Sequence, residues 1–484
     1  MGIVFKQSLK NTLIIYIAFA FGGINALFLY TTILEGKYYG LVTFLLSTAN
    51  LIMPITAFGV HYTIVKFFSS YNTKKEKDAF LSSALLLPLF IAIPIGFFGN
   101  IFYEQVSVFL SSKNPIIKEY TFIIYLIAVF TAYFEIFYAW SKVQLQSVFG
   151  NVLKELWNRV VVMVLLLLVY LEVISKPQFI YILTASYFVR TIVMMLYAFK
   201  YYLPRFTLKL PSNFIEVLKY SGYIILAGSA GAFLLDIDKF MIPKKKAIEM
   251  VAYYSVGVYV GSVIEAPGRA MAQILSPITS KALNENNVDE IDSLYKRSSI
   301  NLLLICGLFF LLINLNISEM YKLLDKEYAG GILVVLMISL AKLFTMSLGN
   351  NGAIISNSKH YKILLPYGIF MALSVYYLNL WLIDLIGING AALSTLIVIF
   401  VFNILKIWYV KRTFNMIPFT VNTYKLLLVL VLFFSAFYFW HFSFHPVVNI
   451  LLKSTLITLL YLIVIKKIVI SEEINNILDK YLPF

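Results

Sequence analysis

The sequence predicts an all-α membrane protein that crosses the bilayer many times. Apolar stretches about twenty residues long recur along the whole chain, and 61% of its 484 residues are hydrophobic whereas 13% are charged. The stretch from Thr12 to Tyr30 contains no charged side chain, and Val160–Leu171 lies inside another such stretch. A helix needs about twenty apolar residues to cross a hydrocarbon core about 30 Å thick. Soluble domains carry roughly 25% charged residues, so we expect no sizeable soluble domain in this chain.

Taken in order, the apolar stretches predict about fourteen transmembrane helices. The first stretch is too long for a signal peptide, and we expect it to be retained as the first helix. The predicted helices cover residues 11–31, 40–66, 80–101, 118–140, 155–174, 178–199, 218–240, 250–276, 298–316, 329–355, 363–383, 385–410, 424–443 and 447–467.

Basic residues in the short connections predict that both termini are cytoplasmic. When the N-terminus is placed inside, most Lys and Arg side chains fall in cytoplasmic connections, as the positive-inside rule requires. Examples are Lys74 and Lys77 early in the chain, and Lys411 and Arg412 near its end. The run Lys244–Lys246 departs from this pattern because it would be external. The run indicates either an anionic partner on the external face or a miscount of helices seven and eight.

Composition argues against several other classes of protein. The formal net charge is +15, but the basic residues flank membrane helices, so we expect no nucleic acid partner. Cys306 is the one cysteine, which excludes a disulfide within the chain and a cysteine metal site. The chain has no GxxxxGK[ST] phosphate loop and no HExxH motif, so we expect neither direct use of ATP nor a metal or other cofactor.

Basic side chains inside predicted helices are the candidate substrate-binding residues. An ionisable group at membrane depth is costly and marks a site by default. Arg190, Arg269 and Lys342 lie on three different helices, so together they predict a cavity for an anionic head group. His61 joins this set, with a structural role at its helix end as the alternative. The alternative for Arg269 is an ion pair with Glu265, which lies four residues earlier on the same helix face.

Acidic side chains inside the helices are candidates for coupling transport to a proton or to Na⁺. They are Glu135, Glu265, Asp236 and Asp238. The two aspartates lie beside Lys239, so pairing with that lysine is the alternative for them. Glu135 is placed either for coupling or for pairing with Arg190.

Three segments carry a resemblance to a known family. They are Glu35–Gly40 (EGKYYG) with Thr63–Phe68 (TIVKFF), Tyr220–Ile242 with its LLDIDKFMI motif, and Val251–Lys281 with the following loop that ends in YKRSS. In layout, about residues 5–412 resemble the polysaccharide flippases of the multidrug/oligosaccharidyl-lipid/polysaccharide (MOP) exporter superfamily, which include O-antigen and capsule repeat-unit flippases. These segments are patterns rather than catalytic motifs, so they point to a family more than to a substrate.

The resemblance implies a fold of two six-helix lobes in a V around a central cavity, plus two C-terminal helices. The lobes would be residues 1–200 and 201–412, and residues 413–484 would hold helices thirteen and fourteen and a short cytoplasmic tail. The implied activity is non-enzymatic transfer of an undecaprenyl-pyrophosphate-linked oligosaccharide across the bacterial cytoplasmic membrane by alternating access. The product would feed O-antigen, lipopolysaccharide, capsule or exopolysaccharide synthesis. Expected partners are the lipid-linked oligosaccharide, membrane lipids and the polymerase or ligase of that pathway.

Two other functions remain open from the sequence. A multidrug or organic-cation antiporter of the same fold would need an acidic cavity, whereas the central charges here are mostly positive. A membrane glycan polymerase or ligase would need catalytic residues in large external loops, which the predicted topology lacks. The sugars of the substrate and the coupling ion are not encoded in any motif of the chain.

Overall fold

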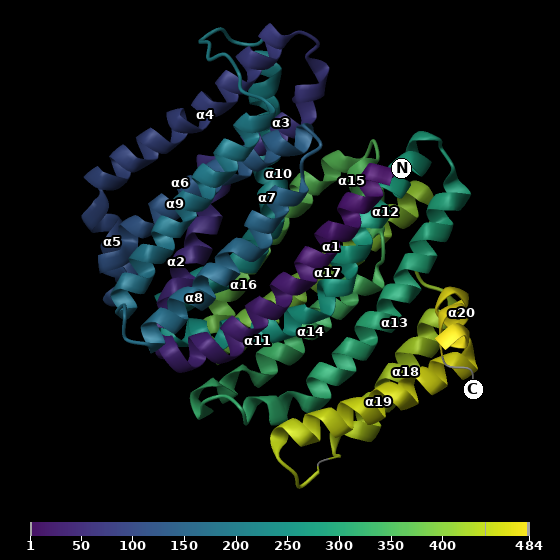
Figure 1. The fold of residues 1–484 in the computed structure, drawn as a ribbon. Coiled ribbons are helices and arrows are strands. Elements are labelled where there is room, and N and C mark those ends of the chain that lie inside the picture. The colour runs from purple at the N-terminus through teal and green to yellow at the C-terminus, as the bar shows by residue number, and fades with distance from the viewer. Residues whose placement is uncertain (1, 441, 482–484) are drawn as a thin grey trace. The chain divides into compact units, whose positions relative to one another are not determined.

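The computed structural model describes residues 2–440 and 442–481, and every regular element in these ranges is helical (Figure 1). The prediction of an all-α fold is therefore confirmed. By their contacts the helices form two compact units. Unit 1 comprises Met1–Ser255 and Leu365–Gly387, and unit 2 comprises Val256–Leu364 and Ile388–Phe484. The lobe boundaries at residues 200 and 412 and the central cavity stay predictions.

Unit 1 holds the N-terminal helices and one helix from later in the chain. Its helices are α1 (Gly2–Ile24), α2 (Glu35–Thr56), α3 (Val60–Phe67), α4 (Lys74–Ile101), α5 (Tyr103–Ser111), α6 (Ile116–Val143), α7 (Val148–Val152), α8 (Asn158–Tyr170), α9 (Lys176–Tyr201), α10 (Phe214–Met241) and α16 (Leu364–Ile386). Two π-helical stretches, Asn25–Leu34 and Leu153–Trp157, join α1 to α2 and α7 to α8. Glu35 has a φ of 58°, which turns the chain between α1 and α2.

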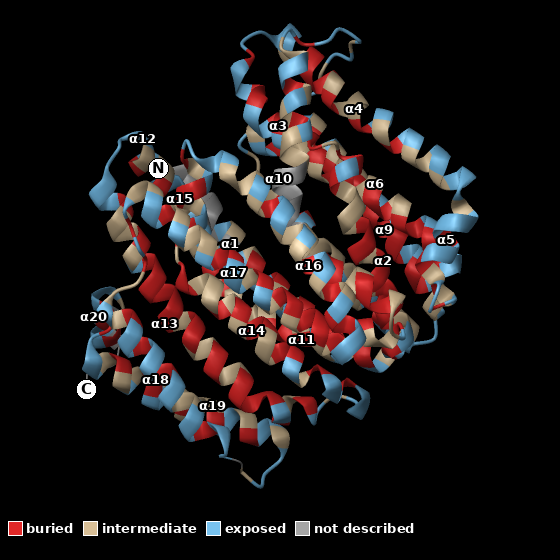
Figure 2. Ribbon diagram, turned by 180° about the vertical axis from the view of Figure 1, so that it is seen from behind, coloured by how far each residue is buried: buried red, intermediate tan, exposed pale blue. Residues whose placement is uncertain are grey.

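The core of unit 1 lies around α6. Phe134 and Trp140 of this helix have no exposed surface, and the Trp140 ring packs edge-on against Phe199 of α9 at 5.6 Å between centroids. Figure 2 shows red, buried segments along α2, α6 and α9, between tan and pale blue ones. Inside a membrane, helices associate through close van der Waals packing, so these interlocking rings fix how α6 and α9 pack.

Unit 2 holds the C-terminal helices. Its helices are α12 (Ala266–Asn284), α13 (Val288–Tyr321), α14 (Ile332–Ser347), α15 (Asn351–Asn357), α17 (Ile388–Phe414), α18 (Val421–Tyr438), α19 (Pro446–Ile468) and α20 (Glu472–Tyr481). Helix α11 (Glu249–Ser262) begins in unit 1 and ends in unit 2. A 3₁₀ turn, Val263–Glu265, links α11 to α12.

Close packing of α11 against α14 depends on two glycines. A Cβ built on Gly257 would lie 2.9 Å from the Cβ of Val334, and one built on Gly261 would lie 3.0 Å from the Cβ of Ile338. The second contact lies four residues after the first on both helices, so the two helices run parallel and keep the same register. Small residues four apart allow helix backbones to approach closely inside a membrane. The two glycines therefore set the distance between these helices.

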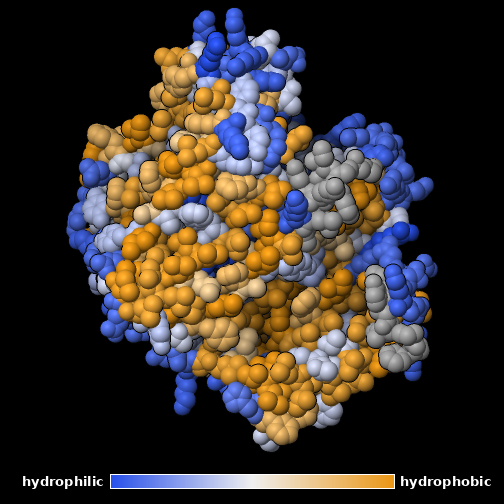
Figure 3. Space-filling model, in the orientation of Figure 1, coloured by the Kyte–Doolittle hydropathy of each residue, from blue (hydrophilic) through white to orange (hydrophobic). Residues whose placement is uncertain are grey.

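The surface and the helix lengths agree with a membrane protein that crosses the bilayer many times. Among the described residues, ten helical segments are long and apolar enough to cross a membrane, and the first, Leu13–Thr56, covers two of the predicted helices. The stretches predicted at 155–174, 218–240 and 250–276 are not among the ten. The count of fourteen stays a prediction. Figure 3 shows hydrophobic side chains over most of the visible face, with hydrophilic ones at its edges, including the end near the start of α4.

Candidate functional site

Three of the predicted site residues meet in unit 2, around one carboxylate. Glu265 Oε2 lies 2.6 Å from Lys342 Nζ, and Glu265 Oε1 accepts hydrogen bonds from Arg269 Nε at 3.1 Å and from Arg269 Nη2. The side chains of Glu265 and Lys342 are each 13% exposed, whereas that of Arg269 is 42% exposed. The alternative expected for Arg269, an ion pair with Glu265, is confirmed as a contact. Lys342 is a second partner that the sequence did not indicate.

The register of α11 on α14 explains why these side chains meet. Gly261 packs against Ile338, and four residues further along both segments lie Glu265 and Lys342. Arg269 follows one turn later on α12, on the same helix face as Glu265. The close approach at the glycines thus brings a carboxylate and an ammonium group into contact. With one acid and two cations, the cluster Glu265–Arg269–Lys342 carries a net charge of +1, so it favours anions.

Arg190 is the most buried of the predicted cations and lies on α9 in unit 1. Its side chain is 4% exposed, and its guanidinium carbon lies 4.1 Å from the ring centroid of Phe134 and 4.7 Å from that of Tyr187. Its Nε is buried and has no hydrogen-bond partner, and no ion pair within the described part of the chain includes Arg190. Aromatic faces attract a guanidinium group, but they satisfy none of its N–H donors. Arg190 therefore keeps unused capacity for an anion.

The expected pairing of Glu135 with Arg190 is not formed. Glu135 instead binds Lys154 Nζ at 2.6 Å. The reason is helix geometry: successive residues on α6 point about 100° apart, so Phe134 faces Arg190 while Glu135 faces the π-helical stretch that carries Lys154. Sequence reasoning missed Lys154 because it lies at the edge of a predicted helix, where a lysine normally reaches solvent.

His61 lies on α3, beside the same carboxylate. Its ring packs 4.1 Å from that of Tyr62, and its buried Nδ1 has no hydrogen-bond partner. The charges of Glu135, Lys142 and Lys154 are close enough to act on His61. The Lys142 ammonium group also lies 3.8 Å from the ring centroid of Tyr138. Unit 1 therefore holds a second cluster, His61–Glu135–Lys142–Lys154, in which cations again outnumber acids.

The two aspartates of α10 have separate partners within unit 1. Asp236 accepts a hydrogen bond from Asn50 at 3.2 Å and lies 3.4 Å from Lys239 Nζ, so the contact with Lys239 expected as its alternative is present. Asp238 is 2% exposed and accepts hydrogen bonds from Asn379 at 2.6 Å and from the Tyr254 hydroxyl. Their proposed coupling role stays a prediction.

The structure thus joins Arg269, Lys342 and Glu265 in unit 2, and places Arg190, His61 and Glu135 in unit 1. A chamber shared by all three permanent cations stays a prediction. Among the described residues, no group of three or more His, Cys, Asp and Glu side chains is arranged to hold a metal ion.

Comparisons with known proteins identify the family of this chain and the solved structures that share its fold. Residues 8–282 match the model of the polysaccharide biosynthesis protein family. A search of curated protein sequences found no match. Among solved structures, the lipid II flippase MurJ in an inward closed conformation is similar, with a TM-score of 0.73 at 14% identity over 95% of this chain and 99% of that one.

Multidrug transporters share the fold as well. An inward-facing multidrug resistance MATE family transporter of the MOP superfamily has a TM-score of 0.59 at 12% identity, over 84% of this chain and 94% of that one. A mutant of the Vibrio cholerae MATE transporter VcmN has a TM-score of 0.54 at 12% identity, over 85% of this chain and 95% of that one. These likenesses show a shared fold, and the family match covers more than half of the chain. The chain therefore belongs to the polysaccharide biosynthesis protein family, and it is a multi-pass membrane protein with the fold seen in MurJ and the MATE transporters.

Proposed function

We propose that this protein flips an undecaprenyl-pyrophosphate-linked oligosaccharide from the inner to the outer leaflet of a bacterial cytoplasmic membrane, by alternating access. The family match and the MurJ-like fold support a lipid-linked cargo. The observation that carries the proposal is that Arg190 is buried without an acid partner among the described residues, and that two cations share one carboxylate in the cluster Glu265–Arg269–Lys342. The product would enter O-antigen, capsule or exopolysaccharide synthesis.

The chemistry of a diphosphate suits these groups. A diphosphate head group cannot cross hydrocarbon without compensation of its charge. Arg binds phosphate oxygens in bidentate fashion, and Lys binds them as a point charge. Glu265 holds Arg269 and Lys342 together while no anion is bound, and an arriving diphosphate would compete with this carboxylate. Arg190 needs no such release, because no acid pairs with it in the described part of the chain.

The test is a leaflet assay in proteoliposomes loaded with a lipid-linked oligosaccharide. Arg190→Met, Arg269→Met and Lys342→Met each remove one cation and keep most of the side-chain volume. A hydrogen bond to a charged group contributes about 1.5–3 kcal/mol, so we expect flipping to slow by roughly 10- to 150-fold in each variant. Lys359→Met, at an exposed lysine, is the matched control and should flip at the native rate. If all three variants also flip at the native rate, the cationic site does not bind the cargo.

Coupling to a proton or Na⁺ is part of the proposal, with Glu135, Glu265, Asp236 and Asp238 as its candidates. Flipping would then depend on an imposed ion gradient, and the Gln or Asn variant of the coupling residue would flip at one rate with and without that gradient. Both termini would be cytoplasmic, and the polymerase or ligase of the same pathway would be a partner.

A drug antiporter is the second candidate, because one solved structure of this fold is the MATE multidrug transporter DinF-BH in complex with a ligand, with a TM-score of 0.57. An organic cation would need a free carboxylate, and Glu135 is engaged by Lys154. Resistance of expressing cells to cationic dyes, lost in Glu135→Gln, would favour this candidate over a flippase.

A further inference from the structure

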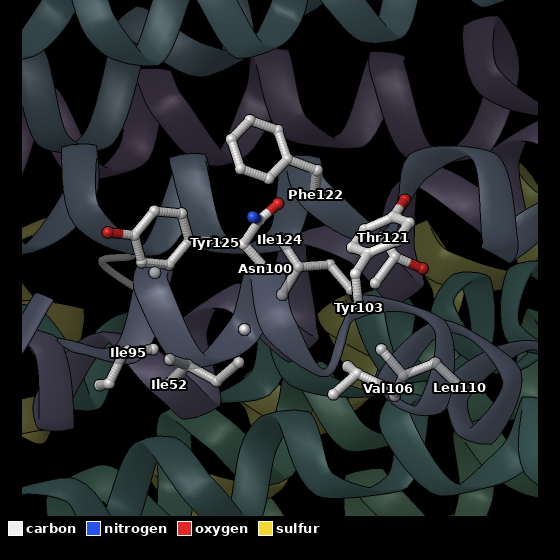
Figure 4. A pocket seen from close by; sticks show the side chains of 12 residues that line it. Ile52, Ile95, Asn100, Tyr103, Val106, Leu110, Thr121, Phe122, Ile124 and Tyr125 are labelled. Carbon is white, nitrogen blue, oxygen red and sulfur yellow. The ribbon is translucent and has the colours of Figure 1, made fainter. Parts of the chain in front are cut away.

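An apolar groove lies in unit 1 where α4 ends and α6 begins (Figure 4). It has a volume of about 220 Å³ and is open along one side. Ile95 of α4, Val106 and Leu110 of α5, and the rings of Phe122 and Tyr125 of α6 line it. The Tyr125 hydroxyl donates a hydrogen bond to the Ala92 carbonyl at 2.8 Å. The hydroxyl is therefore satisfied, and the apolar ring of Tyr125 lines the groove. The groove therefore suits a hydrocarbon chain.

The groove is bordered by the basic run Lys244–Lys246, which follows α10. Lys244 Nζ lies 3.5 Å from the ring centroid of Phe109, and Phe109 precedes Leu110 of the groove wall. Asn114 holds the run in place, because its side-chain amide donates hydrogen bonds to the Pro243 carbonyl at 2.6 Å and to the Lys246 carbonyl at 3.0 Å. The Lys244 ammonium group thus contacts the residue that adjoins the groove wall in the chain.

The charges at this end of unit 1 remain positive after local pairing. Lys118 pairs with Glu104 at 2.6 Å, and Lys245 pairs with Asp384. Two further acids, Glu119 and Glu249, lie on neighbouring turns and form no ion pair within the described ranges. At this end of unit 1, Lys113, Lys244 and Lys246 form no ion pair within the described ranges.

We propose that this end of unit 1 binds an anionic phospholipid, with an acyl chain in the groove and the phosphate at Lys113, Lys244 and Lys246. Exposed aromatic side chains surround the groove, including Phe97 and Phe98, each more than half exposed. A membrane lipid therefore reaches the groove from the bilayer without entering the protein. The site accounts for the lysine run that departs from the positive-inside pattern, and it does not depend on the proposed cargo.

The first test measures the thermal stability of the full chain in mixed micelles, with increasing amounts of phosphatidylglycerol or phosphatidylcholine. A lipid that binds the folded state raises the Tm by mass action, and the rise yields an apparent Kd. We expect the native protein to bind phosphatidylglycerol more tightly. Each Lys→Gln change should weaken binding about fivefold, since a basic residue near an anionic lipid contributes about that factor. Lys244→Gln with Lys246→Gln should therefore remove most of the preference.

A second variant fills the groove without touching the lysines. A Cβ on Gly99 meets no atom within 4 Å, so Gly99→Trp places its ring in the open groove. Gly222→Trp is the matched control, because a Cβ on Gly222 also meets no atom within 4 Å and that residue lies outside the groove. We expect Gly99→Trp to abolish the Tm rise caused by phosphatidylglycerol, and Gly222→Trp to retain it.

Labelling of Lys244 is an independent readout. Burial lowers the pKa of Lys244 to about 8, so an amine-reactive reagent at pH 8 should modify this residue early. Phosphatidylglycerol should protect it, whereas glycerol phosphate, which lacks the acyl chains, should not. Equal Tm rises with phosphatidylglycerol and phosphatidylcholine, an unchanged Kd in Gly99→Trp, or equal protection by glycerol phosphate would each overturn the proposal. Selective protection by the lipid-linked oligosaccharide would do so as well.

Discussion

Removal of Glu265 should cost far more stability than removal of either cation that it binds. At 2.6 Å and an effective dielectric constant of about 20, the gross attraction between Glu265 and Lys342 is about 6 kcal/mol. Most of this attraction offsets the cost of taking both charges out of water. Glu265→Gln withdraws the carboxylate from two cations at once, and loss of one member of a buried pair costs about 3–5 kcal/mol.

Lys342→Met is the milder change because Glu265 keeps its contacts with Arg269. A hydrogen bond to a charged group contributes about 1.5–3 kcal/mol, and the buried methionine recovers part of this loss, so we expect a cost of about 1 kcal/mol. In Glu265→Gln alone, the Lys342 ammonium group stays buried without its carboxylate. The double variant Glu265→Gln with Lys342→Met removes that ammonium group, so its free energy of unfolding should be about 2 kcal/mol higher than that of Glu265→Gln alone.

The assay is a titration with SDS in mixed micelles, which measures the free energy of unfolding of the full chain. Lys359→Met, an exposed change, should alter that free energy by less than about 0.5 kcal/mol and is the control. The reasoning fails if Lys342→Met destabilises the protein as much as Glu265→Gln does, or if the two changes are additive. Either result would mean that Glu265 and Lys342 do not depend on each other.

Three further variants probe other parts of the structure. Gly261→Leu should push α11 away from α14 and lower the free energy of unfolding by about 1–3 kcal/mol. Gly222→Leu is the control, because a Cβ at Gly222 meets open space, and thermal unfolding should distinguish the two variants. Arg190→Leu replaces a buried charge that has no acid partner in the described ranges with an apolar group, so the free energy of unfolding in the same SDS titration should stay equal or rise. The flipping rate should fall. A large loss of stability would instead assign Arg190 a structural role. Lys453→Met should lower stability by about 1–3 kcal/mol, since its ammonium group donates to two backbone carbonyls at 2.8 and 2.9 Å, and an unchanged Tm would contradict those contacts.

Periodicity and length explain why the helical architecture was predictable. A chain in hydrocarbon must satisfy its backbone hydrogen bonds internally, so an apolar stretch of about twenty residues has few options besides a helix. Breaks within a stretch were harder to predict. Gly36 follows the turn at Glu35, and Pro267 and Gly268 follow the 3₁₀ turn Val263–Glu265. Glycine and proline are also common inside unbroken membrane helices, so these residues did not define the breaks by themselves.

The candidate site was predictable as a set of costly charges, but not as a set of contacts. Arg269 and Glu265 lie four residues apart, so their ion pair follows from helix geometry. The contact of Lys342 with the same carboxylate follows from the register of α11 on α14, to which Gly257 and Gly261 contribute. Of the two alternatives predicted for Glu135, pairing with Arg190 is not formed, because Glu135 pairs with Lys154 of a π-helical stretch, and the coupling role stays a prediction.

The amino-acid order alone thus established a helical membrane protein and its family, because hydrophobic length and local segments are properties of neighbouring residues. Which cation meets which carboxylate was settled by packing. Partners such as Glu265 and Lys342, or Asn114 and the Lys244–Lys246 run, are far apart in the chain. A change of one residue in helix register rotates a side chain by about 100°, so such contacts depend on the whole arrangement of neighbouring helices.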